Sequence, residues 1–311
     1  MLRSESLQPA PRPTDTAMSR RLHRRSRYGL LLFALPAVAL YGFVVAVPTV
    51  RGGILSFTDW DGLSQTYDWI GVSNFTKALS DPVSLQALGI TLTIAASVTI
   101  FQTLGGLLLA LAVTTRIKSR NVLRVLFFAP VVITPVVVAY LWQYLLAPNG
   151  AINDLLSVLG FGAIQQDWLG SSVWALVSVI VVIIWQNVGF SMVIYIAGLE
   201  SIPSDISEAA AVDGAGRWRR FISLTWPLLG PATTINLVLT IIAGLKVFSE
   251  VYILTGGGPG TATQTMTTLI YKAAFQFNQF AYSIAIALIL AVIVAFFSAL
   301  QFRASSRLGE Q

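Results

Sequence analysis

The sequence predicts an all-α membrane protein, a polytopic chain with six transmembrane helices. Of its 311 residues, 55% are hydrophobic and only 11% are charged, whereas a soluble domain usually carries about 25% charged residues. Six apolar runs each reach the roughly 20 residues that a spanning helix needs. The runs are continuous, whereas the strands of a membrane barrel would alternate over segments of about 10 residues. Helices are therefore the predicted spanning elements.

The chain is organised around these runs, at residues 28–50, 89–114, 122–146, 173–197, 231–254 and 282–302. We expect residues 1–27 to form a solvated, disordered basic tail. A cleaved signal peptide is the alternative for this part of the chain. The first run is long for the apolar core of a signal peptide and no clear A-x-A site closes it, so an uncleaved first span is predicted.

The placement of lysine and arginine predicts the orientation of the spans. Sixteen of the 20 basic residues fall in four segments that six spans place on one side, at residues 1–27, 115–124, 198–230 and 303–311. Basic residues concentrate on the cytoplasmic side of membrane proteins. Both termini are therefore expected in the cytoplasm. The 51–88 loop is expected outside, together with the 147–172 loop, whose apolar pattern predicts a short interfacial helix.

Composition excludes several chemistries. The chain has no cysteine, which excludes disulfides, thiolate metal sites and a cysteine nucleophile. Its single histidine, His23, lies in the basic tail, so we expect no catalytic residue and no metal site within the membrane. The net charge of +6 would indicate nucleic acid in a soluble protein. Here the basic residues flank apolar runs, so membrane topology and membrane lipid explain them and no nucleic-acid partner is expected.

The 198–230 segment reads as two short helices separated by a turn. Pro203 and Ser204 are a plausible helix start, with acidic residues in the favourable first turn. Asp213-Gly214 is a turn signal, and a second helix is expected from Arg217 to Thr225, stopped by Pro227. Small residues allow another surface to approach closely, and two aromatic side chains offer apolar anchors for it, Trp218 and Phe221. The alternative is a basic loop that only sets topology.

A rare pattern in this segment resembles the EAA loop of ABC importer permeases. It consists of Glu208-Ala209-Ala210, Asp213-Gly214-Ala215, Phe221, Pro227 and Pro231. In that family the loop is a coupling helix that docks into a cleft of a cytoplasmic ATPase. The resemblance therefore implies a role in ATPase coupling for Glu208, Ala209, Ala210, Asp213, Gly214, Ala215, Arg217 and Phe221.

The resemblance extends over residues 28–302. It is carried by "LFFAPVVITPVVVAYLWQYLL" at 126–146, "WQNVGFSMVIYIAGLESIP" at 185–203 and "LTGGGPGTATQT" at 254–265. These stretches are similar to permeases of the carbohydrate (maltose and glycerol-phosphate) binding-protein-dependent importers. The resemblance implies a MetI-like permease core at 89–302, a bacterial inner-membrane location, and a sugar, polyol or sugar-phosphate as solute. The implied partners are a second homologous permease, two ATP-binding subunits and an external solute-binding protein.

No cofactor is expected in this chain, because it has no G-x-x-x-x-G-K-[ST] phosphate loop. The ATP and magnesium that the resemblance implies would belong to the partner ATPase, so the chain is expected to be a transport subunit and not an enzyme. A self-powered secondary transporter or channel is the alternative, and it would need intramembrane acids, of which only Glu250 lies in a span. A membrane enzyme would need a cluster of intramembrane acids or histidines, and the sequence has none.

Polar side chains near the middle of the spans are the candidates for a solute pathway. Polar groups are costly in hydrocarbon and usually face the bundle interior or a water-filled route. Amides and hydroxyls suit a polyhydroxylated solute, and two aromatic rings could stack on a sugar face. The candidates are Gln102, Thr134, Trp185, Asn187 and Tyr195. The alternative is that the amides only bond helix to helix, and the adjacent Gln186 is expected to point away from any route that Asn187 lines.

Two further features are expected in the fifth span and the loop after it. Lys246 and Glu250 are four residues apart, which predicts a shared helix face and an ion pair. A packing or gating role is favoured for this pair over direct solute contact. Gly256, Gly257, Gly258 and Pro259 predict a flexible outer turn, which either contacts the binding protein or serves only as a turn.

Overall fold

The computed structural model describes residues 33–114 and 118–308. The chain divides into two compact units, Met1–Ile54 and Leu55–Gln311, and each is described by itself. Within the described residues the only pairing of extended segments is an isolated bridge between Thr58 and Trp69, and the regular structure is otherwise helical. The all-α prediction is confirmed.

The first unit is built around the helix Phe33–Leu55, which is long and apolar enough to span a bilayer. It includes a π-helical turn, η1 (Gly42–Ala46), followed by α2 (Val47–Leu55). The turn lies just before Pro48, which has no N–H to donate and whose ring crowds the carbonyl four residues earlier. The wider π turn, closed by the Val47 N–H on the Gly42 carbonyl, accommodates that proline within the helix.

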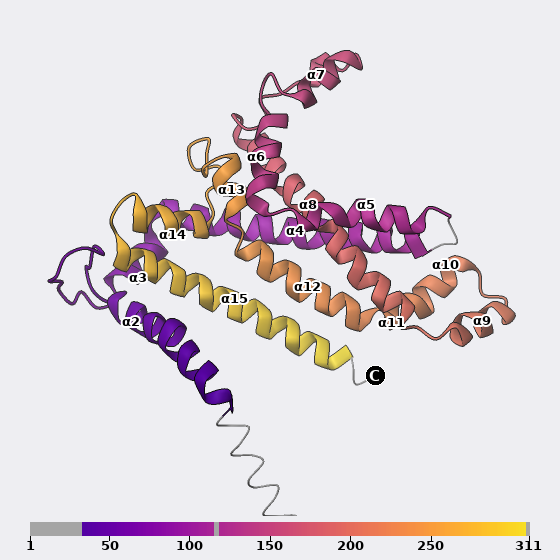
Figure 1. Ribbon diagram of the computed structural model, residues 1–311, viewed down its shortest axis with the longest axis horizontal. Helices are drawn as coiled ribbons and strands as arrows, with labels where there is room; N and C mark the ends of the chain where they lie inside the picture. Colours follow the sequence, from indigo (N-terminus) through magenta and orange to yellow (C-terminus); the bar gives the residue numbers. More distant parts are fainter. Residues whose placement is uncertain (1–32, 115–117, 309–311) are drawn as a thin grey trace, which may run out of the picture. The chain divides into compact units, whose positions relative to one another are not determined.

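The second unit contains the remaining helices (Figure 1). In chain order they are α3 (Ser73–Ser80), α4 (Pro82–Thr114), α5 (Arg120–Val132), α6 (Pro135–Leu145), α7 (Ala151–Val158), η2 (Gly162–Ile164), α8 (Ser172–Glu200), α9 (Ser204–Val212), α10 (Arg217–Arg220), η3 (Phe221–Thr225), α11 (Trp226–Leu228), α12 (Gly230–Leu245), α13 (Ser249–Leu254), α14 (Met266–Phe275) and α15 (Phe280–Leu308). The expected short helix of the 147–172 loop is present as α7.

Four segments of this unit are long and apolar enough to cross a membrane, namely Pro82–Thr114, Ser172–Glu200, Gly230–Leu254 and Phe280–Gln301. With Phe33–Leu55 they account for five of the six predicted spans among the described residues. The sixth, predicted as a continuous helix at 122–146, is instead split into α5 and α6, which are bent by 98°. Figure 1 shows α6 leaving the end of α5 at a steep angle.

Proline explains this difference from the prediction. Thr134 is extended, with ψ of 143°, because the residue before a proline is disfavoured in the α region. Ile133, the C-cap of α5, is also extended, with ψ of 136°. Pro135 then begins α6, where a missing N–H costs nothing. The structure therefore shows a complete break of the helix where a continuous span was predicted.

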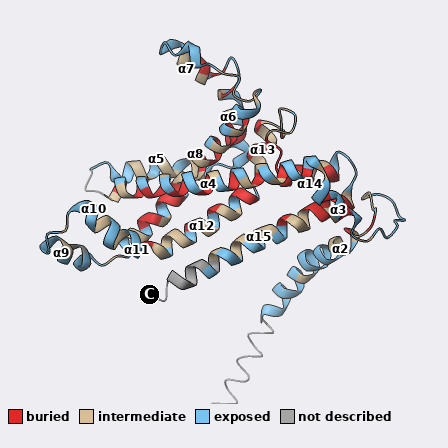
Figure 2. Cartoon of the chain, turned by 180° about the vertical axis from the view of Figure 1, so that it is seen from behind, coloured by how far each residue is buried: buried red, intermediate tan, exposed pale blue. Residues whose placement is uncertain are grey.

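The core of the second unit lies where α4 packs against α8 and α12. Glycines allow the close approach that membrane helices use. A Cβ added at Gly106 of α4 would lie 2.4 Å from the Ser191 Cβ of α8, and one added at Gly244 of α12 would lie 2.7 Å from the Ala95 Cα of α4. Figure 2 shows the buried residues concentrated along α4 and α8, whereas α9 and α10 are mainly exposed.

Candidate functional site: a cavity at two helix breaks

A cavity of about 590 Å³ lies where two interrupted helices meet. One interruption separates α5 from α6, and the other, at Lys246–Phe248, separates α12 from α13. Residues at both breaks line the cavity, together with residues of α4 and α8. The lining residues are Val98, Gln102, Val131, Pro135, Ile183, Asn187, Phe190, Leu239, Thr240, Ile242, Ala243, Gly244, Lys246, Val247, Phe248, Ser249 and Glu250. Non-helical backbone is tolerated at membrane depth where it is buried in protein or lines such a cavity.

Side chains from neighbouring helices satisfy the carbonyls that the breaks release. At the first break, Gln186 Nε2 donates to the Ile133 carbonyl at 2.9 Å. At the second, the Thr267 hydroxyl donates to the carbonyl of Val247. These bonds hold both breaks in place, because an unpaired carbonyl in an apolar environment carries a large desolvation cost.

Two of the predicted pathway residues, Gln102 and Asn187, line the cavity. Gln102 Nε2 also donates to the Asn187 carbonyl at 3.2 Å and to Ser191 Oγ at 2.9 Å. The glutamine therefore both joins α4 to α8 and borders the cavity. Asn187 donates to the Ile183 carbonyl of its own helix. The adjacent Gln186 is absent from the lining, as expected for neighbours on a helix.

Lys246 and Glu250 both line the cavity, but the predicted ion pair is wrong. An ion pair joins Arg124 to Glu200, and none joins Lys246 to Glu250 in the described part of the chain. The physical reason is the break, because α12 ends at Leu245 and α13 begins at Ser249. Residues four apart share a face only on a continuous helix. Glu250 is 8% exposed and stands in the first turn of α13, where a helix favours negative charge.

Three other predicted pathway residues do not line the cavity. Trp185 packs edge to face against Trp142, with ring centroids 5.3 Å apart; it lies two positions before Asn187 and therefore on the opposite side of α8. Tyr195 is fully buried in a cluster between α4, α8 and α12, two helical turns, or about 12 Å, beyond Asn187. Thr134 is exposed at the first break, and only its neighbour Pro135 borders the cavity.

Other lining residues were missed by the sequence reasoning. Phe190, Thr240 and Phe248 border the cavity, but an apolar ring or a threonine within a span is indistinguishable by type from a packing residue. Lys246 gave a signal for the second break, since a lysine within an apolar run indicates irregular surroundings or a water-filled space.

The EAA-like segment forms the predicted helix, turn and helix. Gly214 has a φ of +78°, the left-handed conformation that glycine adopts without strain. The Gly214 N–H bonds the Ala211 carbonyl at 3.1 Å, and the Ala215 N–H bonds the Ala210 carbonyl at 2.9 Å. This pair of bonds is the Schellman motif that closes a helix on a glycine. The closing of the first helix therefore explains why the motif has glycine at position 214, followed by Ala215.

The second helix does not stop at Pro227 as predicted. It continues from α10 through the π-helical η3 into α11, which ends at Leu228. The Trp226 N–H bonds the Phe221 carbonyl five residues back, so the widened turn again lies just before a proline, as it does before Pro48. Pro227 is accommodated because the π turn relieves the clash that its ring would otherwise cause.

The EAA-like segment presents charged and apolar side chains together. Glu208, Ala209 and Arg217 are exposed, and Val212 and Trp218 are 87% and 73% exposed. Of the two expected aromatic anchors, only Trp218 has an exposed side chain that a partner could contact. Phe221 packs against the buried cluster of α4, α8 and α12, and Trp218 stacks on it with centroids 6.0 Å apart.

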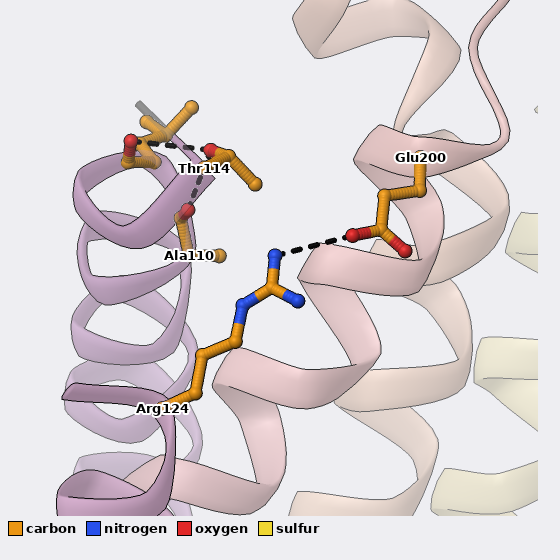
Figure 3. A network of polar contacts seen from close by, with 5 residues as sticks. Ala110, Thr114, Arg124 and Glu200 are labelled. Carbon is orange, nitrogen blue, oxygen red and sulfur yellow. Dashed lines mark hydrogen bonds and ion pairs between the residues drawn. The ribbon is translucent and has the colours of Figure 1, made fainter. Parts of the chain in front are cut away.

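An ion pair joins the helices that flank this end of the unit. Arg124 Nη2 lies 3.1 Å from Glu200 Oε1, as Figure 3 shows. Arg124 belongs to α5, and Glu200 is the last residue of α8, a few residues before α9 begins. The pair therefore connects α5 to the point where the chain enters the EAA-like segment.

The predicted glycine-rich turn is present after α13, and hydrogen bonds join its residues. The Thr263 hydroxyl donates to the Gly258 carbonyl at 2.9 Å and lies 2.6 Å from the Thr255 hydroxyl. Gly256 and Gly257 have φ of +61° and +90°. Gly257 is buried, and Gly256, Gly258 and Pro259 are half-buried. The turn is thus a packed element of the unit.

Comparisons with known proteins place this geometry in a family. The family described as "Binding-protein-dependent transport system inner membrane component" matches residues 102–310. The multiple sugar-binding transport system permease protein MsmF of Streptococcus mutans is 34% identical over 260 residues, covering 84% of this chain and 89% of MsmF. The lactose transport system permease protein LacF of Rhizobium radiobacter is 32% identical over 278 residues, covering 88% of this chain and 93% of LacF.

A solved structure agrees with these relatives. A chain of a bacterial alginate ABC transporter, in complex with an alginate pentasaccharide-bound periplasmic protein, matches with a TM-score of 0.80 and 25% identity, covering 93% of this chain and 98% of that chain. The chain therefore belongs to the binding-protein-dependent transport system inner membrane components, as a multi-pass permease subunit of a carbohydrate ABC importer, a transport component and not an enzyme.

Proposed function

We propose that this permease moves a neutral sugar or polyol through the cavity at the two helix breaks. The observation that carries the proposal is the lining itself, which combines amide, hydroxyl and aromatic groups with one carboxylate and one amine. Amides and hydroxyls both donate and accept, as a polyhydroxylated solute requires. The charges of Glu250 and Lys246 balance, so the cavity favours a neutral solute over an anionic one.

We infer that α9 to α11 form the coupling element that docks on a cytoplasmic ATPase. The segment projects beyond the long helices of the unit (Figure 1), and its exposed side chains combine Val212 and Trp218 with Glu208 and Arg217. Apolar anchors surrounded by charge are the composition of a protein-binding surface. The same assembly would contain a second homologous permease and two ATP-binding subunits.

The proposed orientation follows the positive-inside rule. It places the EAA-like segment and both termini in the cytoplasm of a bacterial inner membrane. The turn at Gly256, Gly257, Gly258 and Pro259 then lies on the outer side, where an external solute-binding protein would dock.

The test is uptake in the native host, with this chain deleted and then restored. Labelled maltose, lactose, xylose and glycerol 3-phosphate are supplied separately, and uptake is measured with and without a protonophore while ATP is held constant. We expect uptake of at least one neutral sugar to depend on the chain and to survive the protonophore. Uptake of glycerol 3-phosphate alone would contradict a neutral solute, and loss of uptake with the protonophore would contradict the ATP-driven mechanism.

A further inference from the structure

Six aromatic side chains form a continuous series that ends at the cavity. In order they are Trp60, Phe280, Phe275, Tyr271, Tyr252 and Phe248. The centroids of successive rings are 5.9, 5.5, 5.2, 5.0 and 5.2 Å apart. Phe248 lines the cavity, and Trp60 stands in the loop between α2 and α3. The series therefore connects the expected outer loop with the cavity.

These rings are distinct from the hydrophobic core. None of the six belongs to the three buried clusters of the second unit or to the side chains packed against them. Phe275 is 63% exposed, and the other five rings are half-buried. Packing of the core therefore does not account for the series, and part of its ring surface is exposed.

The outer end of the series is held in place by hydrogen bonds. Trp60 Nε1 donates to the Ser64 carbonyl at 3.0 Å, and the Ala281 N–H donates to the Trp60 carbonyl at 3.0 Å. Asp61 closes the same loop by accepting from the backbone N–H groups of Ser64 and Leu63 and from the Ser64 hydroxyl. These bonds lower the pKa of Asp61 to about 2, so the loop stays closed over the working pH range.

We propose that this aromatic series is a stacking route along which a sugar passes from the outer surface into the cavity. The inference rests on the proposed function, since it names the path by which that solute reaches the site. The C–H face of a sugar ring is apolar and suits the face of an aromatic ring, while its hydroxyls remain hydrated. The rings are closely spaced, so a sugar that leaves one ring contacts the next before it has lost all contact with the first. Each contact with a ring is weak, so the sugar is released from it easily.

Packing against another subunit is the competing explanation for exposed aromatic rings. The half-burial of five rings and the continuity with the cavity favour a solute route. The experiment is therefore designed so that a covered interface and an open route give opposite results.

The first measurement is sugar uptake at limiting concentration in the native host, with maltose, lactose and xylose as separate probes. We expect Tyr271→Leu and Phe275→Leu each to lower uptake about three- to tenfold, the loss of one aromatic contact. Tyr271→Phe should retain uptake. The matched control is Phe277→Leu, because Phe277 is 60% exposed, lies two residues beyond the end of α14 and makes no ring contact in the described structure. Membrane levels of each variant and recovery of the assembled complex are measured in parallel.

The second measurement uses the absence of cysteine from the chain. Single variants Tyr271→Cys, Phe275→Cys and Phe277→Cys are exposed to a membrane-impermeant maleimide in intact cells, and labelling of this chain is read by mass. We expect all three to be labelled, and a transported sugar to protect positions 271 and 275 but not 277.

Three results would overturn the proposal. The first is normal uptake by both leucine variants at normal membrane level. The second is labelling of position 277 alone, which would indicate that another subunit covers the rings. The third is labelling of positions 271 and 275 without protection by sugar. If the wild-type chain carries none of the three sugars, the proposed function itself fails, a result that is distinct from these three.

Discussion

The guanidinium of Arg124 lies 3.1 Å from the carboxylate of Glu200, joining the first turns of α5 to the last turn of α8. The side chains are 31% and 61% exposed. The sequence predicted Arg124 only as one of the basic residues that orient the chain. Its partner lies 76 residues away, directly before the EAA-like segment. The pair therefore joins α5 to the end of α8 that supports this segment.

We predict that breaking this pair changes coupling more than stability. Exposed ion pairs contribute about 0.2–1 kcal/mol, so Arg124→Gln and Glu200→Gln should each lower the unfolding midpoint in detergent by only a few degrees. We expect both to lower the sugar moved per ATP hydrolysed, because the end of α8 loses its tie to α5.

The charge-reversed double variant, Arg124→Glu with Glu200→Arg, is the internal control. It restores opposite charges at the same two positions and should recover coupling that either reversed single variant loses. Equal coupling in wild type and both single variants would contradict a positioning role for the pair.

The turn at Gly214 gives the second prediction. Nothing lies within 4 Å of a Cβ added there, but its φ is +78°, so a substitution acts through backbone strain alone. Gly214→Val should strain the turn most, because a left-handed backbone costs a non-glycine residue about 1–2 kcal/mol and a β-branched residue more. Gly214→Glu should be intermediate. We expect both proteins to remain in the membrane and to lose ATP-coupled uptake.

Gly214→Asn is the matched control, because asparagine tolerates the left-handed region. It should retain most of the coupled uptake. If the asparagine and valine variants lose uptake equally, the backbone conformation is not what the ATPase requires from this position.

The fold was predictable where its causes are local in the chain. Apolar runs of spanning length, the turn at Gly214 and the helix start near Ser204 depend on neighbouring residues, and each is present in the structure. Pro135 is a local cause of the break between α5 and α6. The broken helix is held by Gln186, more than 50 residues away, so the neighbouring sequence does not give the size of the bend. The break after Leu245 has no proline to announce it, and the adjacent Gly244 packs against Ala95 of α4.

Only the amide side chains that line the cavity were predictable from the sequence. Gln102 and Asn187 stand out because amides are costly in hydrocarbon, and both border the cavity. Depth along a helix does not reveal which face a residue occupies relative to its neighbours, so it did not show that Trp185 and Tyr195 lie away from this cavity. The Lys246–Glu250 ion pair was wrong for a related reason, since it assumed a helix that the structure interrupts.

A third prediction concerns the break between α5 and α6. Gln186→Leu removes the donor to the Ile133 carbonyl while keeping a side chain of similar size. The bond to the Ile133 carbonyl is part-buried, so losing it should cost about 1 kcal/mol, the lower end of the cost of an unpaired buried group. We therefore expect a lower unfolding midpoint in detergent, by about 2–4 °C per kcal/mol. Gln65→Leu, in an exposed loop, is the control and should change stability by less than about 0.5 kcal/mol. Equal midpoints for the two variants would show that the break does not depend on Gln186.

The last prediction concerns Glu250, the one buried carboxylate that borders the cavity. Glu250→Gln keeps the shape and removes the charge. Hydrogen bonds to a charged group contribute about 1.5–3 kcal/mol and those to a neutral group about 0.5–1.5 kcal/mol, so the difference of about 1 kcal/mol corresponds to roughly a fivefold loss of uptake at limiting sugar. The maximal rate at saturating sugar should change less, because the coupling element is untouched.

Asp154→Asn, which removes an exposed carboxylate on α7, is the control and should leave both rates unchanged. If Glu250→Gln transports normally, the carboxylate serves the helix break alone and the solute is held by the amides and rings of the cavity.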